Sequence, residues 1–392
     1  MAQAYIVGAV RTAGGRKGGR LSGWHPVDLG AQLVDALLRR YGVDGALVDD
    51  LILGCVSQVG EQSTNLARNV VLASGTLPQT VPGTTVDRQC GSSEQAIHFA
   101  AQAVMSGWMD VGVAGGVESM SRVPMGLPQA LPEREGFGSY MSPAVQRRYG
   151  VSQFSQFDGA EAIAQRYGIS REQLDAYALL SHQRAAAAAD AGAFDAEIEP
   201  LAVRTADGGG EGLHRRDEGV RADTSAQALA GLRALREGGV ITAGNASQIC
   251  DGASAVLVAS EQGLRAIGAM PLARIHHMSV LGGDPVVMLL APVEATRRAL
   301  QRSGLSLDGI DLYEVNEAFA SVPLAWGREL DADPQRLNVH GGAIALGHPL
   351  GASGARLMTT LVHALHRRGA RYGLQTMCEG GGMANVTIVE RM

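Results

Sequence analysis

A cysteine stands where a strand-like run of the sequence gives way to an amphipathic helix. Cys90 lies in "VDRQCGSSEQAIHFAAQAVMSG", residues 86–107, and three small residues follow it directly. The start of a helix leaves backbone N–H groups unpaired and carries a partial positive charge. That environment favours the thiolate, which is the nucleophilic form of cysteine. A small buried hydrophobic residue is an equal alternative when this stretch is taken alone.

Two further stretches carry residues suited to the same chemistry. His348 lies between a glycine and a proline in "GHPLGASG", residues 347–354, so a turn holds it. Cys378 ends an apolar run, and Gly380 is the first of three glycines in "CEGGGMA", residues 378–384. Glycines at such a place let the backbone approach a ligand and aim N–H groups at it, although a tight turn is the alternative.

Asn316 opens a fourth stretch, "NEAF", residues 316–319, where capping of the following helix is the alternative to a role in the site. A nucleophilic cysteine, a histidine, a second cysteine and backbone donors together predict acyl transfer through a thioester. The remaining cysteines, Cys55 and Cys250, lie in apolar or glycine-flanked segments, and we expect them to be structural.

The composition is that of a globular protein of two or more domains. The chain has 392 residues, 46% of them hydrophobic and 18% charged, which allows sizeable cores. A formal net charge of −6 gives no expectation of a nucleic-acid partner. The four cysteines show no metal-ligand spacing, which predicts reduced thiols and no metal site in a cytoplasmic protein. Neither a signal peptide nor an apolar run of about 20 residues is present, so no membrane insertion is expected.

The elements that must position these residues alternate between short apolar runs and helical patterns, which predicts an α/β fold. Strands are expected over residues 4–10, 49–56 and 110–119, and helices over 26–40, 63–74 and the run after Cys90. From about residue 120 to 156 the pattern breaks into a stretch bearing proline and glycine. Helical patterns follow over 158–193, and the alternation resumes near residue 240.

The second half of the chain echoes the first. Three matched pairs, each 261 positions apart, are Asp50 and Asp311, Ser92 and Ser353, and Glu118 and Glu379. Chance likeness between any two α/β halves is the alternative, but one offset in three segments favours a duplication. Corresponding loops of a duplicate meet near a pseudo-twofold axis, so we expect Cys90 and the loop of His348 to face one pocket.

These motifs together resemble the thiolase family, the acetyl-CoA acyltransferases. Matches run from "AVRT", residues 9–12, to "CEGGGMA", and include "GGVESMSRVPMG", "TAGNASQICDGASA" and "NVHGGAIALGHPLGASG". The resemblance implies two similar α/β halves in a five-layer αβαβα arrangement with an inserted loop domain. The expected parts are an N-terminal half of residues 1–119 plus 249–270, a loop domain of 120–248 for coenzyme A and oligomer contacts, and a C-terminal half of 271–392.

The resemblance also implies a role for each candidate residue. Cys90 would be the acylated nucleophile, His348 would help to activate it, and Cys378 would be the acid/base that exchanges the α-proton of acetyl-CoA. The amides of Cys90 and Gly380 would form one oxyanion hole, while His348 and a water held by Asn316 would form another. Two developing oxyanions need two sets of donors, so the assignment is chemically sensible.

Coenzyme A is expected as a substrate, with no tightly bound cofactor, and a homodimer or homotetramer is expected as the assembly. By resemblance Ser247 would contact the pantetheine, Phe319 would line its tunnel, and Arg221 would lie by the nucleotide end. Arg215 and Arg216 are further candidates for phosphate, with solvated surface charges as an equally good interpretation.

The implied reaction is the thiolytic cleavage of 3-ketoacyl-CoA, or the reverse Claisen condensation, through an acyl-Cys90 intermediate. Two departures bear on the substrate: Ser155–Gln156 stands where acetoacetyl-forming thiolases carry His–Met, and His340 stands where the family has asparagine. The first favours degradative substrates of β-oxidation, with a larger acyl group, over a biosynthetic acetoacetyl-CoA-forming enzyme.

Two rivals remain. A decarboxylating ketoacyl synthase would pair its cysteine with two histidines, and Cys378 argues against it. A catalytically silent acyl-CoA or sterol carrier should have lost one of Cys90, His348 and Cys378, and this chain has all three.

Overall fold

A mixed β-sheet runs through the centre of the protein. The computed structural model describes residues 2–392, within which ten strands form one sheet. Its strands are β1 (Tyr5–Arg11), β2 (Gly15–Arg16), β3 (Asp50–Gly54), β4 (Gly83–Val86), β5 (Val111–Ser119), β8 (Cys250–Ala259), β9 (Ala273–Gly282), β10 (Leu312–Val315), β11 (Tyr372–Glu379) and β12 (Met383–Arg391). The order across the sheet is β10-β11-β12-β9-β1-β8-β5-β3-β4, with β2 beside β8.

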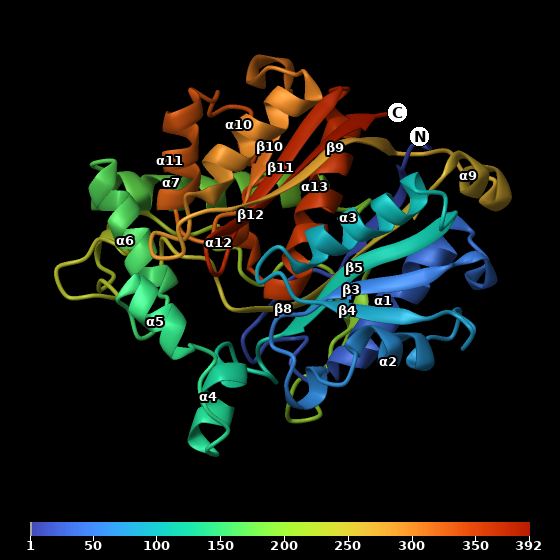
Figure 1. Ribbon diagram of the computed structural model, residues 1–392, viewed down its shortest axis with the longest axis horizontal. Helices are drawn as coiled ribbons and strands as arrows, with labels where there is room; N and C mark the ends of the chain where they lie inside the picture. The colour runs from blue at the N-terminus through green and yellow to red at the C-terminus, as the bar shows by residue number, and fades with distance from the viewer. Residues whose placement is uncertain (1) are drawn as a thin grey trace.

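Helices cover and divide this sheet (Figure 1). Those outside the inserted segment are α1 (Pro26–Tyr41), α2 (Leu66–Ala73), α3 (Ser92–Met105), α9 (Glu261–Ile267), α10 (Ala291–Ser303), α11 (Ser321–Leu330), α12 (Ala343–Leu346) and α13 (Ser353–Arg368). The strands and helices predicted for the first 119 residues all form, with bounds shifted by at most a few residues.

The predicted repeat is visible in the strand order. From β1 outwards the first half runs β8, β5, β3, and from β9 outwards the second half runs β12, β11, β10. The halves meet where β1 pairs with β9, antiparallel, at Tyr5 and Ile6. α3 and α13 begin at Ser92 and Ser353, and β5 and β11 begin at Val111 and Tyr372, both 261 positions apart. The duplication is therefore confirmed.

Three apolar clusters give the order of the layers. The first joins α1 and α2 to strands of the first half, the second joins α10 and α11 to strands of the second half, and the third contains α3 and α13 between the two sets of strands. Figure 1 shows α3 and α13 at the centre of the molecule, with α1 and α2 on one side and α10 and α11 on the other. The predicted five-layer α/β class is confirmed.

Local sequence explains why these helices begin and end where they do. The side chain of His25 accepts a hydrogen bond from the N–H of Val27, and Pro26 occupies the first turn of α1, where a missing N–H costs nothing. Gly42 and Gly369 end α1 and α13 with φ of 64° and 63°, a conformation that glycine adopts without strain.

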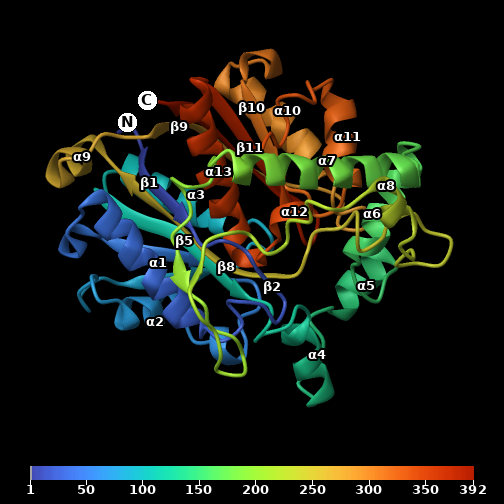
Figure 2. The ribbon, with the colours of Figure 1, turned by 180° about the vertical axis from the view of Figure 1, so that it is seen from behind.

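The segment between β5 and β8 contributes short elements outside the layers. They are α4 (Leu127–Arg134), α5 (Pro143–Tyr149), α6 (Gln156–Arg166), α7 (Arg171–Asp190), β6 (Leu201–Ala202), β7 (Leu213–His214) and α8 (Ala226–Ala230). Figure 1 shows α4 projecting from the body, and Figure 2 shows α7 lying across the back near α12. Whether this segment forms a separate loop domain stays a prediction.

One expectation for this segment is wrong in detail. The break in pattern over residues 120–156 contains α4 and α5, because Pro128 and Pro143 sit in first turns, where proline favours a helix. Among residues 2–392, no helix combines the length and apolar character that crossing a bilayer demands.

Candidate active site

Cys90 lies in a tight turn between β4 and α3. Gln89 has φ of 50°, a left-handed conformation that a residue with a side chain adopts at a cost of about 1 kcal/mol or more. The turn is held by Ser92, whose Oγ accepts from the Arg88 N–H (2.9 Å) and donates to the Gln89 carbonyl (2.6 Å). Asp87 Oδ1 accepts from the Gln89 N–H at 2.7 Å. These contacts fix the cysteine at the entrance of α3.

The environment of Cys90 differs from the one expected at a helix start. Burial is the main cause that raises the pKa of the Cys90 thiol to about 12. The N–H groups of Cys90 and Gly380 are directed at the sulfur and lower the pKa, but they do not outweigh burial. The expectation of a resting thiolate is therefore wrong: the resting group is a neutral thiol, which needs a base.

His348 has the hydrogen bonds that make it such a base. Its Nδ1 lies 2.5 Å from Ser353 Oγ, and that hydroxyl donates its own proton to the Pro349 carbonyl at 2.9 Å. Nδ1 must then carry the imidazole proton, which leaves Nε2 with a lone pair that can accept from Asn316 Nδ2 at 3.4 Å. Burial lowers the pKa of His348 to about 3, with the charge of Arg356 as a second cause. A neutral imidazole is thus ready to accept a proton at Nε2.

Asn316 lies beside that nitrogen, directly after β10. Its Nδ2 is 3.4 Å from His348 Nε2, and its N–H donates to the Thr376 carbonyl at 3.0 Å. It does not cap a helix, because α11 begins at Ser321 and has no side-chain cap. Within residues 2–392 its buried Oδ1 has no hydrogen-bond partner, a condition that an ordered water would relieve.

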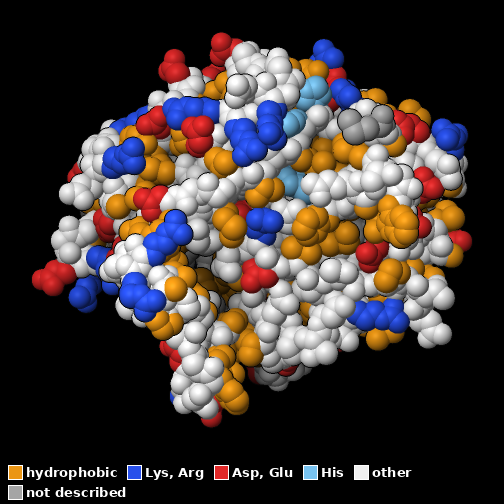
Figure 3. Space-filling model, in the orientation of Figure 1, with side chains coloured by type: hydrophobic (Ala, Val, Ile, Leu, Met, Phe, Trp, Pro, Cys, Tyr) orange, Lys and Arg blue, Asp and Glu red, His pale blue; other side chains and the backbone are white. Residues whose placement is uncertain are grey.

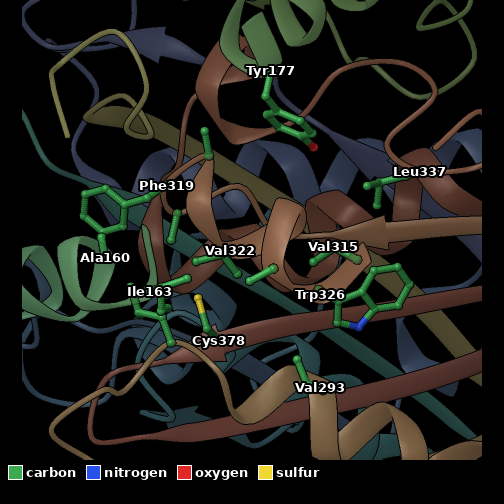
Figure 4. Close-up of a cluster of buried hydrophobic side chains, with 14 of the residues drawn as sticks. Ala160, Ile163, Tyr177, Val293, Val315, Phe319, Val322, Trp326, Leu337 and Cys378 are labelled. Carbon is green, nitrogen blue, oxygen red and sulfur yellow. The ribbon is translucent and has the colours of Figure 1, made fainter. Parts of the chain in front are cut away.

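Cys378 lies at the end of β11, on the face that meets α11. Figure 4 shows its sulfur pointing among Ile163 and Val322 in the apolar cluster. Burial raises the pKa of this thiol well above its usual value, and the nearby Cys90 is the next cause. The two thiols therefore lie near each other.

The two halves are joined at this point by contacts that sequence reasoning missed. Ser93 Oγ, at the start of α3, accepts from the Ala355 N–H at the start of α13 at 2.9 Å. The Glu118 carboxylate accepts from the Gly351 N–H at 2.9 Å, which ties the loop of His348 to β5. The sequence repeat pairs Glu118 with Glu379, and this pairing is the feature of the sequence that could have drawn attention to these two glutamates.

The residues expected to hold coenzyme A fall in two places. The Ser247 N–H donates to the Ala318 carbonyl at 2.9 Å, and Phe319 packs edge-on against Phe157 at 5.6 Å between ring centroids. Arg221 is exposed on a neighbouring loop, where its N–H donates to His182 Nδ1 at 3.2 Å. Arg215 and Arg216 are exposed as well, and Arg216 pairs with Asp190 at 3.3 Å.

The two departures from the family pattern have distinct surroundings. His340 packs edge-on against Phe194 at 5.9 Å, and burial lowers its pKa to about 4, so it is a neutral packing residue. Ser155 Oγ accepts from the Asp158 N–H at 3.2 Å and caps α6, while Gln156 Nε2 lies 3.8 Å from Met125 Sδ. Among residues 2–392 no cluster of three or more histidine, cysteine or acidic side chains could hold a metal ion.

Comparison with known proteins covers the whole chain. Two family models match, "Thiolase, N-terminal domain" over residues 4–262 and "Thiolase, C-terminal domain" over residues 269–391. The steroid 3-ketoacyl-CoA thiolase FadA6 of Mycobacterium tuberculosis is 54% identical over 100% of this chain and 95% of its own length. The beta-ketoadipyl-CoA thiolase of Escherichia coli is 44% identical, with 100% of both chains covered. Among solved structures, the acetyl-CoA acetyltransferase of Bacillus anthracis has a TM-score of 0.91 at 38% identity, covering 100% of this chain and 99% of that one.

Proposed function

The chain belongs to the thiolase family and has its acyltransferase activity, and we propose that it cleaves 3-ketoacyl-CoA thioesters with acyl groups larger than acetoacetyl, with Cys90, His348 and Cys378 as the catalytic residues. Two observations support this assignment of residues: Cys378 lies near enough to Cys90 to be affected by its charge, and a hydrogen bond joins the start of α3, after Cys90, to the start of α13, after the loop of His348.

The first step in this proposal is attack of Cys90 on the ketone carbon. As the new carbon–sulfur bond forms, the thiol proton moves to His348 Nε2. The ketone oxygen becomes an oxyanion, which the N–H groups of Cys90 and Gly380 stabilise. Because both groups already point at the sulfur, they lie near the place where this charge develops.

The second step breaks the bond between C2 and C3 of the substrate. The ketone carbonyl re-forms on Cys90, and the electron pair moves into the enolate of acetyl-CoA. His348, now carrying the proton on Nε2, and a water on Asn316 Oδ1 stabilise the enolate oxygen, while the Cys378 thiol donates its proton to C2. Coenzyme A then passes its thiol proton to Cys378 and attacks acyl-Cys90, and Cys90 recovers its proton from His348. No proton is gained or lost over the cycle.

The rivals named by the sequence fit the site less well. A decarboxylating synthase needs a second histidine, and this chain has Cys378 at that place. A silent carrier has no use for the hydrogen bonds that leave His348 Nε2 unprotonated. We further propose the division into two halves and a loop domain of residues 120–248, and an oligomeric cytoplasmic enzyme.

The preference for a larger acyl group follows from the residues around Gln156. Ser155 is turned toward its own helix as a cap, so only Gln156 contacts Met125 on the segment that leads into α4. The chain between α4 and α5 exposes large apolar side chains, Phe137 at 84% and Tyr140 at 58%. Figure 3 shows hydrophobic side chains along the projecting α4 and at its junction with the body. Apolar surface of this kind marks binding sites for ligands or partners.

We therefore expect a higher kcat/KM for a 3-ketoacyl-CoA bearing a ring than for acetoacetyl-CoA. Gln156→Met should lower the ratio of the two kcat/KM values by about tenfold, since a change in pocket volume discriminates by that order. Gln165→Met is the matched control, because Gln165 is exposed on the same helix. An unchanged preference in Gln156→Met, or a wild-type preference for acetoacetyl-CoA, would reject the larger substrate.

We expect Arg221 to bind the anionic nucleotide end of coenzyme A. Arg221→Ala should weaken coenzyme A binding by about tenfold or more, the usual worth of a charge-assisted hydrogen bond. A pantetheine thioester without the nucleotide should bind as before. Calorimetric titration of both ligands measures the difference, with Arg265→Ala on α9 as the control. Equal weakening of both ligands would assign the arginine to folding instead.

A further inference from the structure

Glu379 is a buried acid that the proposed reaction does not use. It lies between Cys378 and Gly380 in sequence, its side chain is fully buried, and neither carboxyl oxygen has a hydrogen-bond partner among residues 2–392. A Cβ on Gly91 would overlap Glu379 Oε1 and would lie 3.0 Å from Asn385 Oδ1. The carboxyl group therefore packs against Gly91, the residue before α3. It lies near Asn385 Oδ1, which also lacks a hydrogen-bond partner among residues 2–392.

The orientation of Asn385 is fixed by the groups around its amide nitrogen. Thr387 Oγ1 donates to Glu94 Oε1 at 2.6 Å, so it must accept from His98 Nε2 at 2.7 Å. His98 Nδ1 then has a lone pair, which accepts from Asn385 Nδ2 at 3.2 Å. The amide oxygen of Asn385 is therefore the atom that faces Glu379.

Two oxygens with only lone pairs would repel each other in a site without water. A proton on Glu379 removes this conflict, because the acid can donate to Asn385 Oδ1 and pair both atoms. The second carboxyl group of the network, Glu94, accepts from Thr387 and from Gln375 Nε2 at 2.9 Å. Burial raises the pKa of Glu94 to about 8 in spite of these donors. Of two acids that share a buried site, the one with donors ionises more readily, so Glu379 holds its proton more firmly than Glu94.

The repeat gives an internal comparison. Glu118 occupies the equivalent position on β5, and it accepts hydrogen bonds from three backbone N–H groups and from Gln62. One of these donors is Gly351, whose equivalent 261 positions earlier is Cys90. Glu118 accepts a hydrogen bond from the Gly351 N–H. The equivalent N–H, that of Cys90, is not bonded to Glu379 and is directed at the Cys90 sulfur instead.

We propose that Glu379 is a positioning residue held as a neutral carboxylic acid, which donates a hydrogen bond to Asn385 Oδ1 and leaves the N–H groups of Cys90 and Gly380 available to the reacting oxygen. The inference rests on the proposed function for the role of those two groups. An ionised Glu379 would compete for the same donors and would place a negative charge beside both cysteines.

The charged and titratable groups around Glu379 agree with this arrangement. Glu94 and His98 face it from α3, Arg88 and Cys90 from the preceding turn, and Cys378 from β11. Burial raises the pKa of Glu379 well above its usual value, and Glu94 is the second cause, while Arg88 and the backbone N–H of Asn385 oppose the rise. Ionisation at high pH would raise the pKa of both thiols and disfavour the oxyanion.

Infrared spectroscopy of the intact protein near neutral pH tests the protonation state directly. The wild-type spectrum should contain the C=O stretching band of a protonated carboxyl group that is missing in Glu379→Gln. Glu172→Gln is the control, because this exposed glutamate has a lowered pKa and gives no such band. Absence of a difference between wild type and Glu379→Gln would overturn the neutral acid.

The rate of Cys90 acylation tests the positioning role. Glu379→Gln keeps a donor for Asn385 and should retain most of the wild-type rate, whereas Glu379→Met should lose about ten- to a hundredfold in kcat with little change in KM. The rate ratio of Glu379→Gln to wild type should rise with pH, because only the wild type can ionise. A ratio independent of pH, or equal losses in both variants, would overturn the role. Failure of the wild type itself to acylate Cys90 would reject the proposed function, while the infrared result would still decide the state of Glu379.

Discussion

Brief mixing of the protein with acetyl-CoA, stopped by acid, is expected to leave an acetyl group on Cys90, and Cys90→Ala is expected to lose acyl transfer and thiolysis together. The thiol is partly accessible at the entrance of α3, whereas Cys55, Cys250 and Cys378 are buried. Loss of a nucleophile that acts with a base typically costs about 10³-fold or more in rate. Peptide mass analysis of the quenched sample locates the label.

The effect depends on proton transfer within the site. With a pKa of about 12 for the Cys90 thiol and about 3 for His348, the thiol is protonated and the imidazole is neutral at neutral pH. In the proposed step the proton moves to His348 only as the carbon–sulfur bond forms. Acylation should therefore persist well below pH 6.5, the usual pKa of histidine, because this imidazole stays neutral there. Cys55→Ala is the control, since Cys55 is a buried cysteine whose thiol lies against Glu118. A label on another cysteine, or an active enzyme without any label, would refute the assignment.

The fold was predictable because each element carries its own pattern. Alternating apolar runs and helical periodicity placed β1, β3, β5 and α1 within a few residues, and one offset of 261 positions predicted the second half from the first. The helices α4 and α5 were missed because they expose most of their residues, so no apolar face marks them in the sequence.

The residues that we propose as catalytic could be named as candidates from the sequence, but their protonation states could not. A helix start suggested a thiolate at Cys90, and that effect is real, since two N–H groups point at the sulfur. Its magnitude is small beside the cost of burying a charge, which depends on packing from both halves. The unprotonated Nε2 of His348 depends on Ser353 and Pro349, whose hydrogen bonds only the folded turn defines.

Glu379 illustrates the same limit more sharply. Its position in the repeat made it an equivalent of Glu118, and sequence gives no reason to expect the two to differ. In the structure the Glu118 carboxyl group accepts four hydrogen bonds from N–H groups, whereas neither oxygen of Glu379 has a partner among residues 2–392. The difference arises from β12 and α3, which bring Asn385 and Gly91 against Glu379.

The second large effect is expected from Cys378→Ala, which should separate acyl transfer from carbon–carbon chemistry. Cleavage of a 3-ketoacyl thioester releases an enolate that must be protonated, and condensation must remove the same proton. Cys90 cannot serve while it carries the acyl group, so a second group is required. The Cys378 thiol is suited to donate, because burial raises its pKa and keeps it protonated at rest.

Cys378→Ala should therefore still take an acetyl group from acetyl-CoA onto Cys90 and return it to coenzyme A. It should lose about 10²- to 10⁴-fold in cleavage and condensation, the usual contribution of general acid–base catalysis. Exchange of deuterium into the methyl group of acetyl-CoA should fall by a similar factor. Cys90→Ala provides the contrast, because it should lose acyl transfer as well.

Three measurements on the same two variants decide whether Cys378 is the acid/base: acetyl label on Cys90, methyl exchange by NMR, and the rate of 3-ketoacyl-CoA cleavage. A Cys378→Ala protein that fails to label Cys90 has lost more than the acid, since its side chain also packs in the apolar cluster with Ile163 and Val322. Thermal unfolding would then show the lost packing. If labelling, exchange and condensation all stay near wild type, the proton is carried by another group, and His348 is the next candidate because its Nε2 already exchanges a proton with Cys90 in the proposed first step.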